Sequence, residues 1–109
     1  MRTFLLTFSA LLNQTQVHSV LSTSAAVETW ITPFPFSAIV VSRLTVLELG
    51  AVLHSHFDDA LFILVEANRF NTGGWLPLEF WNVINDPQGA WSKKAFSLPN
   101  LGAEAKNIP

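Results

Sequence analysis

Short apolar runs alternate with turn-forming residues from about Ile39 onward, and this alternation constrains the fold more than any other feature. The runs occupy residues 39–41, 44–49, 51–57, 61–66, 75–84 and 91–98. Apolar runs of this length at near-regular spacing are typical of an all-β sandwich or barrel rather than of helices. We therefore predict a small, single-core, all-β domain.

The segments between the runs contain residues that favour turns. Gly50 separates the second and third runs, and Asp58 and Asp59 separate the third and fourth. Residues 71–74 (Asn-Thr-Gly-Gly) suit a hairpin loop, because Asn and Gly adopt positive φ at low cost. Residues 86–89 (Asp-Pro-Gln-Gly) have the order of a type I turn. These positions predict where strands end.

A single helix over residues 37–69 is the competing interpretation. Four residues in this range follow passable helical spacing: Leu44, Leu47, Ala51 and His54. Periodicity alone therefore permits a helix. The β-branched content and the interruptions at Gly50 and Asp58 favour strands instead.

The N-terminal part differs from the rest in composition, since residues 1–29 contain no proline or glycine and are rich in Ser, Thr and Gln. We therefore divide the chain into an N-terminal segment (1–29) and a barrel domain (30–109). The apolar run at residues 4–12 has the character of a secretory signal, with small residues for cleavage at 24–26. It also fits a first strand or a short packed helix, which we favour because polar residues 13–16 interrupt the signal pattern. A cytoplasmic location is accordingly favoured over secretion.

Composition narrows the function classes. Charged residues make up only 13% of the chain and the net charge is −2, with Lys93 and Lys94 as the one basic pair. Nucleic-acid binding needs a basic patch, so this class is disfavoured. The absence of cysteine excludes disulfides and thiolate zinc sites, and no apolar stretch reaches the roughly 20 residues of a transmembrane helix. Half of the residues are apolar, which favours a sheet buried on both faces or a homodimer.

The pair His54 and His56 is the most informative candidate site. Residues two apart in a strand project from the same face, so both imidazoles could reach one metal ion. Neutral imidazoles suit iron, nickel, copper or zinc, and Asp58 or Asp59 could supply a carboxylate ligand. The alternative is that they are two ordinary histidines at a barrel mouth, hydrogen-bonded to backbone or water.

Residues 43–67 (RLTVLELGAVLHSHFDDALFILVEA) resemble the first motif of the cupin superfamily: a glycine turn, His-x-His, an acidic residue and an apolar strand that ends in glutamate. Residues 74–77 (Gly-Trp-Leu-Pro) and 85–92 are similar to the second half of ChrR-type and acetylacetone-dioxygenase-type cupins. The resemblance covers about residues 30–97. It implies a jelly-roll barrel with a pocket at its mouth.

The resemblance also implies a function. A cupin of this kind would bind one divalent metal (Fe, Zn or Mn) through His54 and His56, with Asp59 as a further ligand. It would then use dioxygen to cleave a small dicarbonyl or hydroxy-ketone. Aromatic side chains, among them Phe62, Trp81 and Trp91, would line the substrate pocket or simply form the core.

Two ligand positions of the family pattern carry other residues. Ala60 stands where the ligand glutamate is expected, and Trp91 or Ser92 stands where the last histidine is expected. These departures favour a second hypothesis, a non-catalytic cupin that binds a small ligand or dimerises without metal. A third hypothesis, suggested by the high apolar fraction, is an accessory subunit of a larger assembly.

Overall fold

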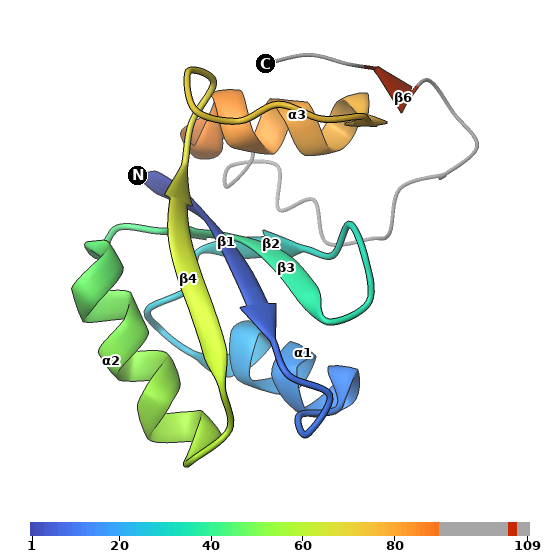
Figure 1. The fold of residues 1–109 in the computed structure, drawn as a ribbon. Helices are drawn as coiled ribbons and strands as arrows, with labels where there is room; N and C mark the ends of the chain where they lie inside the picture. Colours follow the sequence, from blue (N-terminus) through green and yellow to red (C-terminus); the bar gives the residue numbers. More distant parts are fainter. Residues whose placement is uncertain (90–104, 107–109) are drawn as a thin grey trace.

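The computed structural model describes residues 1–89 and 105–106. At its centre is a four-stranded antiparallel sheet with the strand order β2-β3-β1-β4 (Figure 1). The strands of this sheet are β1 (Arg2–Phe8), β2 (Thr29–Ile31), β3 (Ser37–Ser42) and β4 (Phe62–Ala67). The helices are α1 (Gln14–Thr23), α2 (Val46–Phe57) and α3 (Leu78–Asn85). A separate two-stranded sheet pairs β5 (Leu76–Pro77) with β6 (Ala105–Lys106).

The first six elements follow each other as β1-α1-β2-β3-α2-β4. The first and third strands lie side by side in the middle of the sheet, and the second and fourth form its edges. This is the split βαβ topology, also called the ferredoxin-like arrangement. The β5–α3 segment is an addition to that arrangement.

Helices α1 and α2 cover one face of the sheet and form the larger core with it. Every second residue of β1 points into this core, in keeping with the period of two of a strand. Its fully or nearly fully buried residues are Phe4, Leu6, Phe8, Leu12, Val17, Leu21, Ala38, Val40, Leu49, Leu53 and Phe57. The two helices are therefore held by apolar stripes on their sheet-facing sides.

Helix α3 covers part of the opposite face. Its buried residues pack on the outer side chains of β2 and β3, and these form the second core of Ile31, Ile39, Val41, Phe80, Trp81, Val83 and Ile84. All six residues of β3 are buried, because this strand has a helix layer on each face. The β1–β4 half of the same face lies beyond α3, and there Leu5, Ile63 and Val65 are exposed.

The structure confirms antiparallel strands over two of the predicted runs, since β3 contains residues 39–41 and β4 overlaps residues 61–66. It also confirms the strand interpretation of the N-terminal run, which forms β1. The described residues combine this antiparallel sheet with helices in a mixed α+β domain, so the structure bears out the strands of the prediction but not its all-β class. The described chain has no helix long and apolar enough to cross a membrane.

The predicted strand at residues 51–57 is wrong, because these residues belong to α2. The helix begins with a capping box: the Thr45 hydroxyl accepts from the Glu48 N–H, and the Glu48 carboxylate accepts from the Thr45 N–H. Gly50 lies inside the helix, where a Cβ would meet no atom of a neighbouring element within 4 Å. The helix ends at Asp58, whose φ of 52° and ψ of −124° lie outside the helical region.

The predicted strand at residues 75–84 is also wrong over most of its length. Only Leu76 and Pro77 form a strand, and residues 78–84 belong to α3. Residues 71–74 do form a loop, but this loop is not a hairpin, because β4 pairs with β1 and β5 pairs with β6. This short helix buries four residues together on one side: Phe80, Trp81, Val83 and Ile84. In so short an apolar run, periodicity alone does not distinguish a helix from a strand.

Candidate functional site

His54 and His56 do not share a face of the chain. Both lie in the last turn of α2, and both are exposed. A helix turns by about 100° per residue, so residues two apart leave it roughly 200° apart around the axis. Asp59 is exposed in the turn that follows the helix. The extended backbone on which shared ligation depends is therefore absent at this position.

The rest of the described chain offers no alternative metal centre. Residues 1–89 and 105–106 contain no group of three or more His, Asp or Glu side chains placed to hold one ion.

The predicted aromatic pocket residues lie apart. Phe62 packs on the α1–α2 side of the sheet, with its ring 5.7 Å from that of Phe57 in an edge-on contact. Trp81 is 1% exposed and lies in the second core, on the opposite face. Trp91 lies outside the described residues. Phe62 and Trp81 therefore do not line one pocket.

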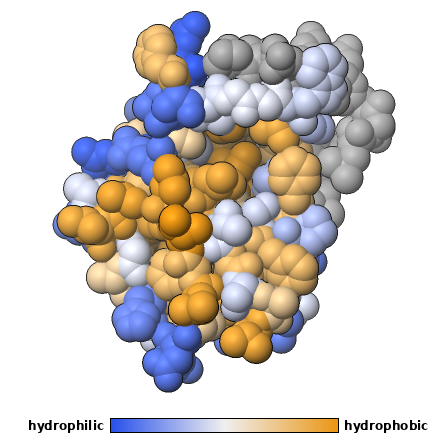
Figure 2. Space-filling view, in the orientation of Figure 1, coloured by the Kyte–Doolittle hydropathy of each residue, from blue (hydrophilic) through white to orange (hydrophobic). Residues whose placement is uncertain are grey.

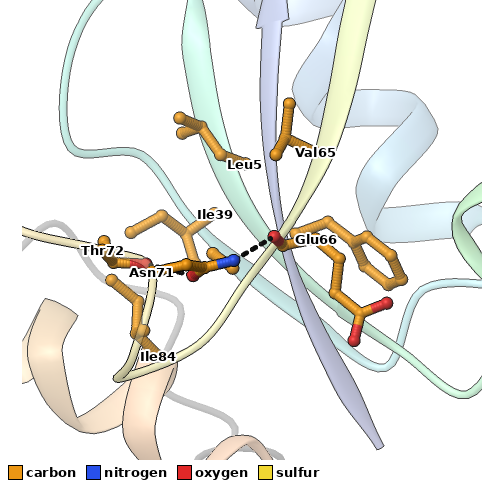
Figure 3. Close-up of a pocket in the computed structure, with 9 residues that line it drawn as sticks. Leu5, Ile39, Val65, Glu66, Asn71, Thr72 and Ile84 are labelled. Carbon is orange, nitrogen blue, oxygen red and sulfur yellow. Dashed lines mark hydrogen bonds between the residues drawn. The ribbon is translucent and has the colours of Figure 1, made fainter.

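An apolar pocket lies instead on the β1–β4 half of the sheet, beside α3 (Figure 3). Its volume is about 150 Å³. Figure 3 shows Leu5 and Val65 on the sheet side of the hollow, with Ile84 and the loop after β4 facing them. The lining consists of Phe4, Leu5, Ile39, Val65, Glu66, Ala67, Asn71, Thr72 and Ile84. We call this hollow the apolar pocket.

The loop at the rim of the apolar pocket is held by asparagine side chains. The Asn71 amide donates to the Glu66 carbonyl oxygen at 3.3 Å, and the Asn71 Oδ1 accepts from the Asn68 N–H at 2.8 Å. Asn68 in turn accepts from the Phe70 N–H at 2.8 Å. Such local bonds offer the backbone an alternative to continued pairing and fix a tight turn. Hydrogen bonds among residues 66–71 therefore hold the loop at the pocket rim in place.

A second hollow of about 250 Å³ lies next to the apolar pocket and shares Glu66, Ala67 and Ile84 with it. Arg2 and Arg69 line this hollow, and we call it the arginine hollow. The Arg2 Nε lies 3.8 Å from the Glu66 Oε1, and the Arg69 guanidinium lies 5.5 Å from the centre of the Phe70 ring. Two guanidinium groups and one carboxylate leave the side chains of this hollow with an excess of positive charge.

No protein-family model matches this chain, and no curated protein or solved structure is significantly similar to it. The cupin resemblance therefore stays a prediction. Among the described residues, the two hollows are the features that bear most directly on function.

Sequence reasoning missed both hollows, although part of their signal is visible. The alternation in β4 gives Ile63 and Val65 one face, and the Asn-x-x-Asn spacing of Asn68 and Asn71 marks a self-bonded turn. What the sequence does not reveal is that α3 stops short of this half of the sheet. That boundary depends on tertiary packing between residues far apart in the chain.

Proposed function

We propose that this protein is a non-catalytic binding module for a small ligand that has an apolar, ring-sized body and an anionic end. The observation that carries the proposal is the junction of the apolar pocket and the arginine hollow at Glu66, Ala67 and Ile84. This corresponds to the second hypothesis from the sequence, a non-catalytic module that binds a small ligand without metal.

The apolar pocket sets the size of the ligand body. A cavity of roughly 150 Å³ lined by aliphatic side chains holds about one benzene ring. Leu5, Ile39, Val65 and Ile84 supply such a lining. Small ligands gain at most about 1.5 kcal/mol per non-hydrogen atom, and a partly open site gains less. Weak binding of a single-ring compound is the expected behaviour.

The arginine hollow sets the charge of the ligand. Guanidinium groups bind carboxylates with paired, charge-assisted hydrogen bonds. Arg2 already has Glu66 as a partner at 3.8 Å, which leaves Arg69 as the more available cation. An anionic end is therefore favoured there, and an ammonium group is disfavoured.

The chemistry of the lining supports binding rather than catalysis. The described residues that line the two hollows include no His, Ser, Asp or Lys. Thr3 donates its hydroxyl proton to the Val83 carbonyl oxygen, and Thr72 donates to Asn71. Neither hydroxyl is therefore paired with a general base, which an activated nucleophile requires.

Three matched single-ring probes test the proposal: benzoate, benzyl alcohol and benzylamine. We would titrate each into isotopically labelled protein and follow backbone amide shifts by NMR. We expect benzoate to bind most tightly, roughly tenfold more tightly than benzylamine, because the charge-assisted bonds favour the anion. The largest shifts should fall on residues 65–72.

Variants assign the binding to these hollows. Leu5→Trp fills the apolar pocket and should abolish the shifts, whereas Thr7→Trp, an exposed change on the same face of β1 outside the lining, should preserve them. Arg69→Gln should remove the preference for benzoate over benzyl alcohol. Equal binding of all three probes, or benzoate binding that survives Leu5→Trp, would contradict the proposal.

A further inference from the structure

Strand β4 has a free edge in the part of the chain that the structure describes, since it pairs with β1 alone. The Ser9 N–H donates to the Leu61 carbonyl oxygen at 3.0 Å and continues the β1–β4 register one step beyond the Phe8–Phe62 pair. Bonded and non-bonded pairs alternate along an antiparallel ladder. It follows that the backbone N–H and C=O groups of Ile63 and Val65 bond to β1. Those of Phe62, Leu64 and Glu66 point outward, away from β1.

This edge lacks the features that normally protect an edge strand. Proteins place lysine, proline or bulges on exposed edges to prevent pairing with another chain. The sequence of β4 is FILVEA, in which Glu66 is the one charged residue. Leu61, Ile63 and Val65 are 73%, 62% and 49% exposed. Figure 2 shows apolar side chains across the middle of the molecule on the β4 side.

We propose that a second copy of this chain pairs with the β4 edge, antiparallel, so that two four-stranded sheets join into one. A two-fold axis perpendicular to the sheet keeps the α1–α2 layers of both copies on the same side. Residues that lie opposite each other in the two copies must then point to the same face of the joined sheet. A shift of the register by one residue would break this rule, because it turns every side chain to the other face. The register centred on Leu64 satisfies this condition, with Leu64 opposite Leu64 of the second copy.

That register matches outward backbone groups and exposed side chains. Leu64 pairs with its counterpart, and Phe62 pairs with Glu66 of the second copy, through the groups that point away from β1. Ile63 lies opposite Val65 of the second copy in non-bonded pairs, whose side chains approach most closely. The Glu66 carbonyl oxygen already accepts from Asn71, and a carbonyl oxygen can accept a second hydrogen bond.

The same register is complementary in charge. Counted beyond both ends of β4 (Phe62–Ala67), this register brings the turn that contains Asp59 near the turn that contains Arg69 of the second copy, and the reverse. Among the described residues, neither Asp59 nor Arg69 forms an ion pair within its own chain. This match favours a second copy over a partner of unrelated sequence.

The size of the interface predicts a concentration-dependent dimer. A six-residue strand is about 20 Å long, and an edge of this length buries less than the roughly 800 Å² per partner of a standard interface. The pairing does not depend on ligand binding in the apolar pocket. A negative ligand titration would therefore leave it standing.

Charge exchange tests the pairing. Sedimentation of the wild-type chain over a range of concentrations should show a monomer–dimer equilibrium. Asp59→Arg and Arg69→Asp should each weaken dimerisation by roughly tenfold, because like charges then meet twice in each dimer. An equimolar mixture of these two variants should restore dimerisation, since opposite charges again face each other. Glu79→Arg, a matching charge change on exposed α3 surface, should have no effect.

Cross-linking tests the register. The chain contains no cysteine, so Ile63→Cys/Val65→Cys introduces the only thiols. This variant should form a disulfide-linked dimer on mild oxidation, because opposed residues of a non-bonded pair lie within disulfide range. Ile63→Cys alone should cross-link much more slowly. A monomer at every concentration, binding of β4 by another protein in place of a second copy, or failure of the variant mixture to associate would overturn the proposal.

Discussion

The Thr3 hydroxyl donates to the Val83 carbonyl oxygen at 3.0 Å, across 80 residues of sequence. In a continuous helix this carbonyl would accept from the residue four positions later, but that residue is Pro87, which has no N–H. Thr3 therefore satisfies a buried acceptor at the end of α3. One hydroxyl on β1 thus connects the added helix to the middle of the sheet.

Replacing this hydroxyl should destabilise the protein. Thr3→Val keeps the shape of the side chain and leaves the Val83 carbonyl oxygen unpaired, which should cost about 1–3 kcal/mol of unfolding free energy. Chemical denaturation measures this loss. Thr7→Val is the control, because Thr7 lies on the same face of β1 but is exposed. Equal effects of the two substitutions would show that the hydrogen bond contributes nothing.

The capping box at the start of α2 should make stability depend on pH. The Thr45 backbone N–H, followed by the Thr45 hydroxyl, lowers the pKa of Glu48 below its ordinary value of 4.5. A lowered folded-state pKa means that the carboxylate contributes stability above the unfolded-state pKa and loses it as pH falls through the folded-state pKa. Wild type should therefore exceed Glu48→Gln in stability at neutral pH, and the difference should vanish once acid has protonated the carboxylate.

Thr45 is the source of this effect, so its removal should reduce it. Thr45→Ala should cost about 1 kcal/mol at neutral pH, the usual value of an N-cap. In the Thr45→Ala background, Glu48→Gln should produce a smaller pH-dependent change in stability than it does in the wild-type background. Unfolding titrations from neutral pH into the acid range give both results. An unchanged pH dependence would assign the effect to another interaction.

Helical placement of residues 46–57 can be tested through two leucines. Leu53 is 0% exposed and Leu47 is 83% exposed. Leu53→Ala should cost about 2–5 kcal/mol because it leaves a cavity in the main core, whereas Leu47→Ala should change stability by less than about 0.5 kcal/mol. In the strand interpretation His54 and His56 point into the barrel. Leu53 then points to the opposite face, away from the barrel interior. A small effect of Leu53→Ala would therefore favour the strand.

The two histidines give a complementary test. Both are exposed on α2, so His54→Ala and His56→Ala should each change stability by less than about 0.5 kcal/mol. Elemental analysis of the purified protein should give the same metal content for wild type and both variants. Stoichiometric iron, zinc or manganese that is lost in His54→Ala would contradict the helical geometry and support the cupin hypothesis.

Prediction from the sequence succeeded where a pattern had one physical meaning. Asp58 and Asp59 precede β4 and residues 71–74 follow it, and the short apolar runs of β3 and β4 favour strands. The error at α2 came from treating Gly50 as a break, although a helix interior accepts one glycine at a cost of about 1 kcal/mol. The Thr45-x-x-Glu48 capping signature followed by Leu49, Leu53 and Phe57 at helical spacing was the stronger signal.

The site was less accessible to sequence reasoning than the fold. His54 and His56 attract attention because their spacing suits a strand, and the same spacing separates them on a helix. The apolar pocket is formed by β1, β4 and α3, and its existence depends on how far α3 reaches across the sheet. No local pattern carries that information, since it comes from long-range packing of Trp81 and Ile84 on β3.

The two edges of the sheet are unequal in length, because β2 has three residues and β4 has six. A chain with two long, open edges could add neighbours in both directions and grow into a fibre. Here one edge is too short to template a further strand, so growth would stop once the other edge is occupied. In the proposed dimer, the short β2 would therefore limit self-assembly to a closed pair.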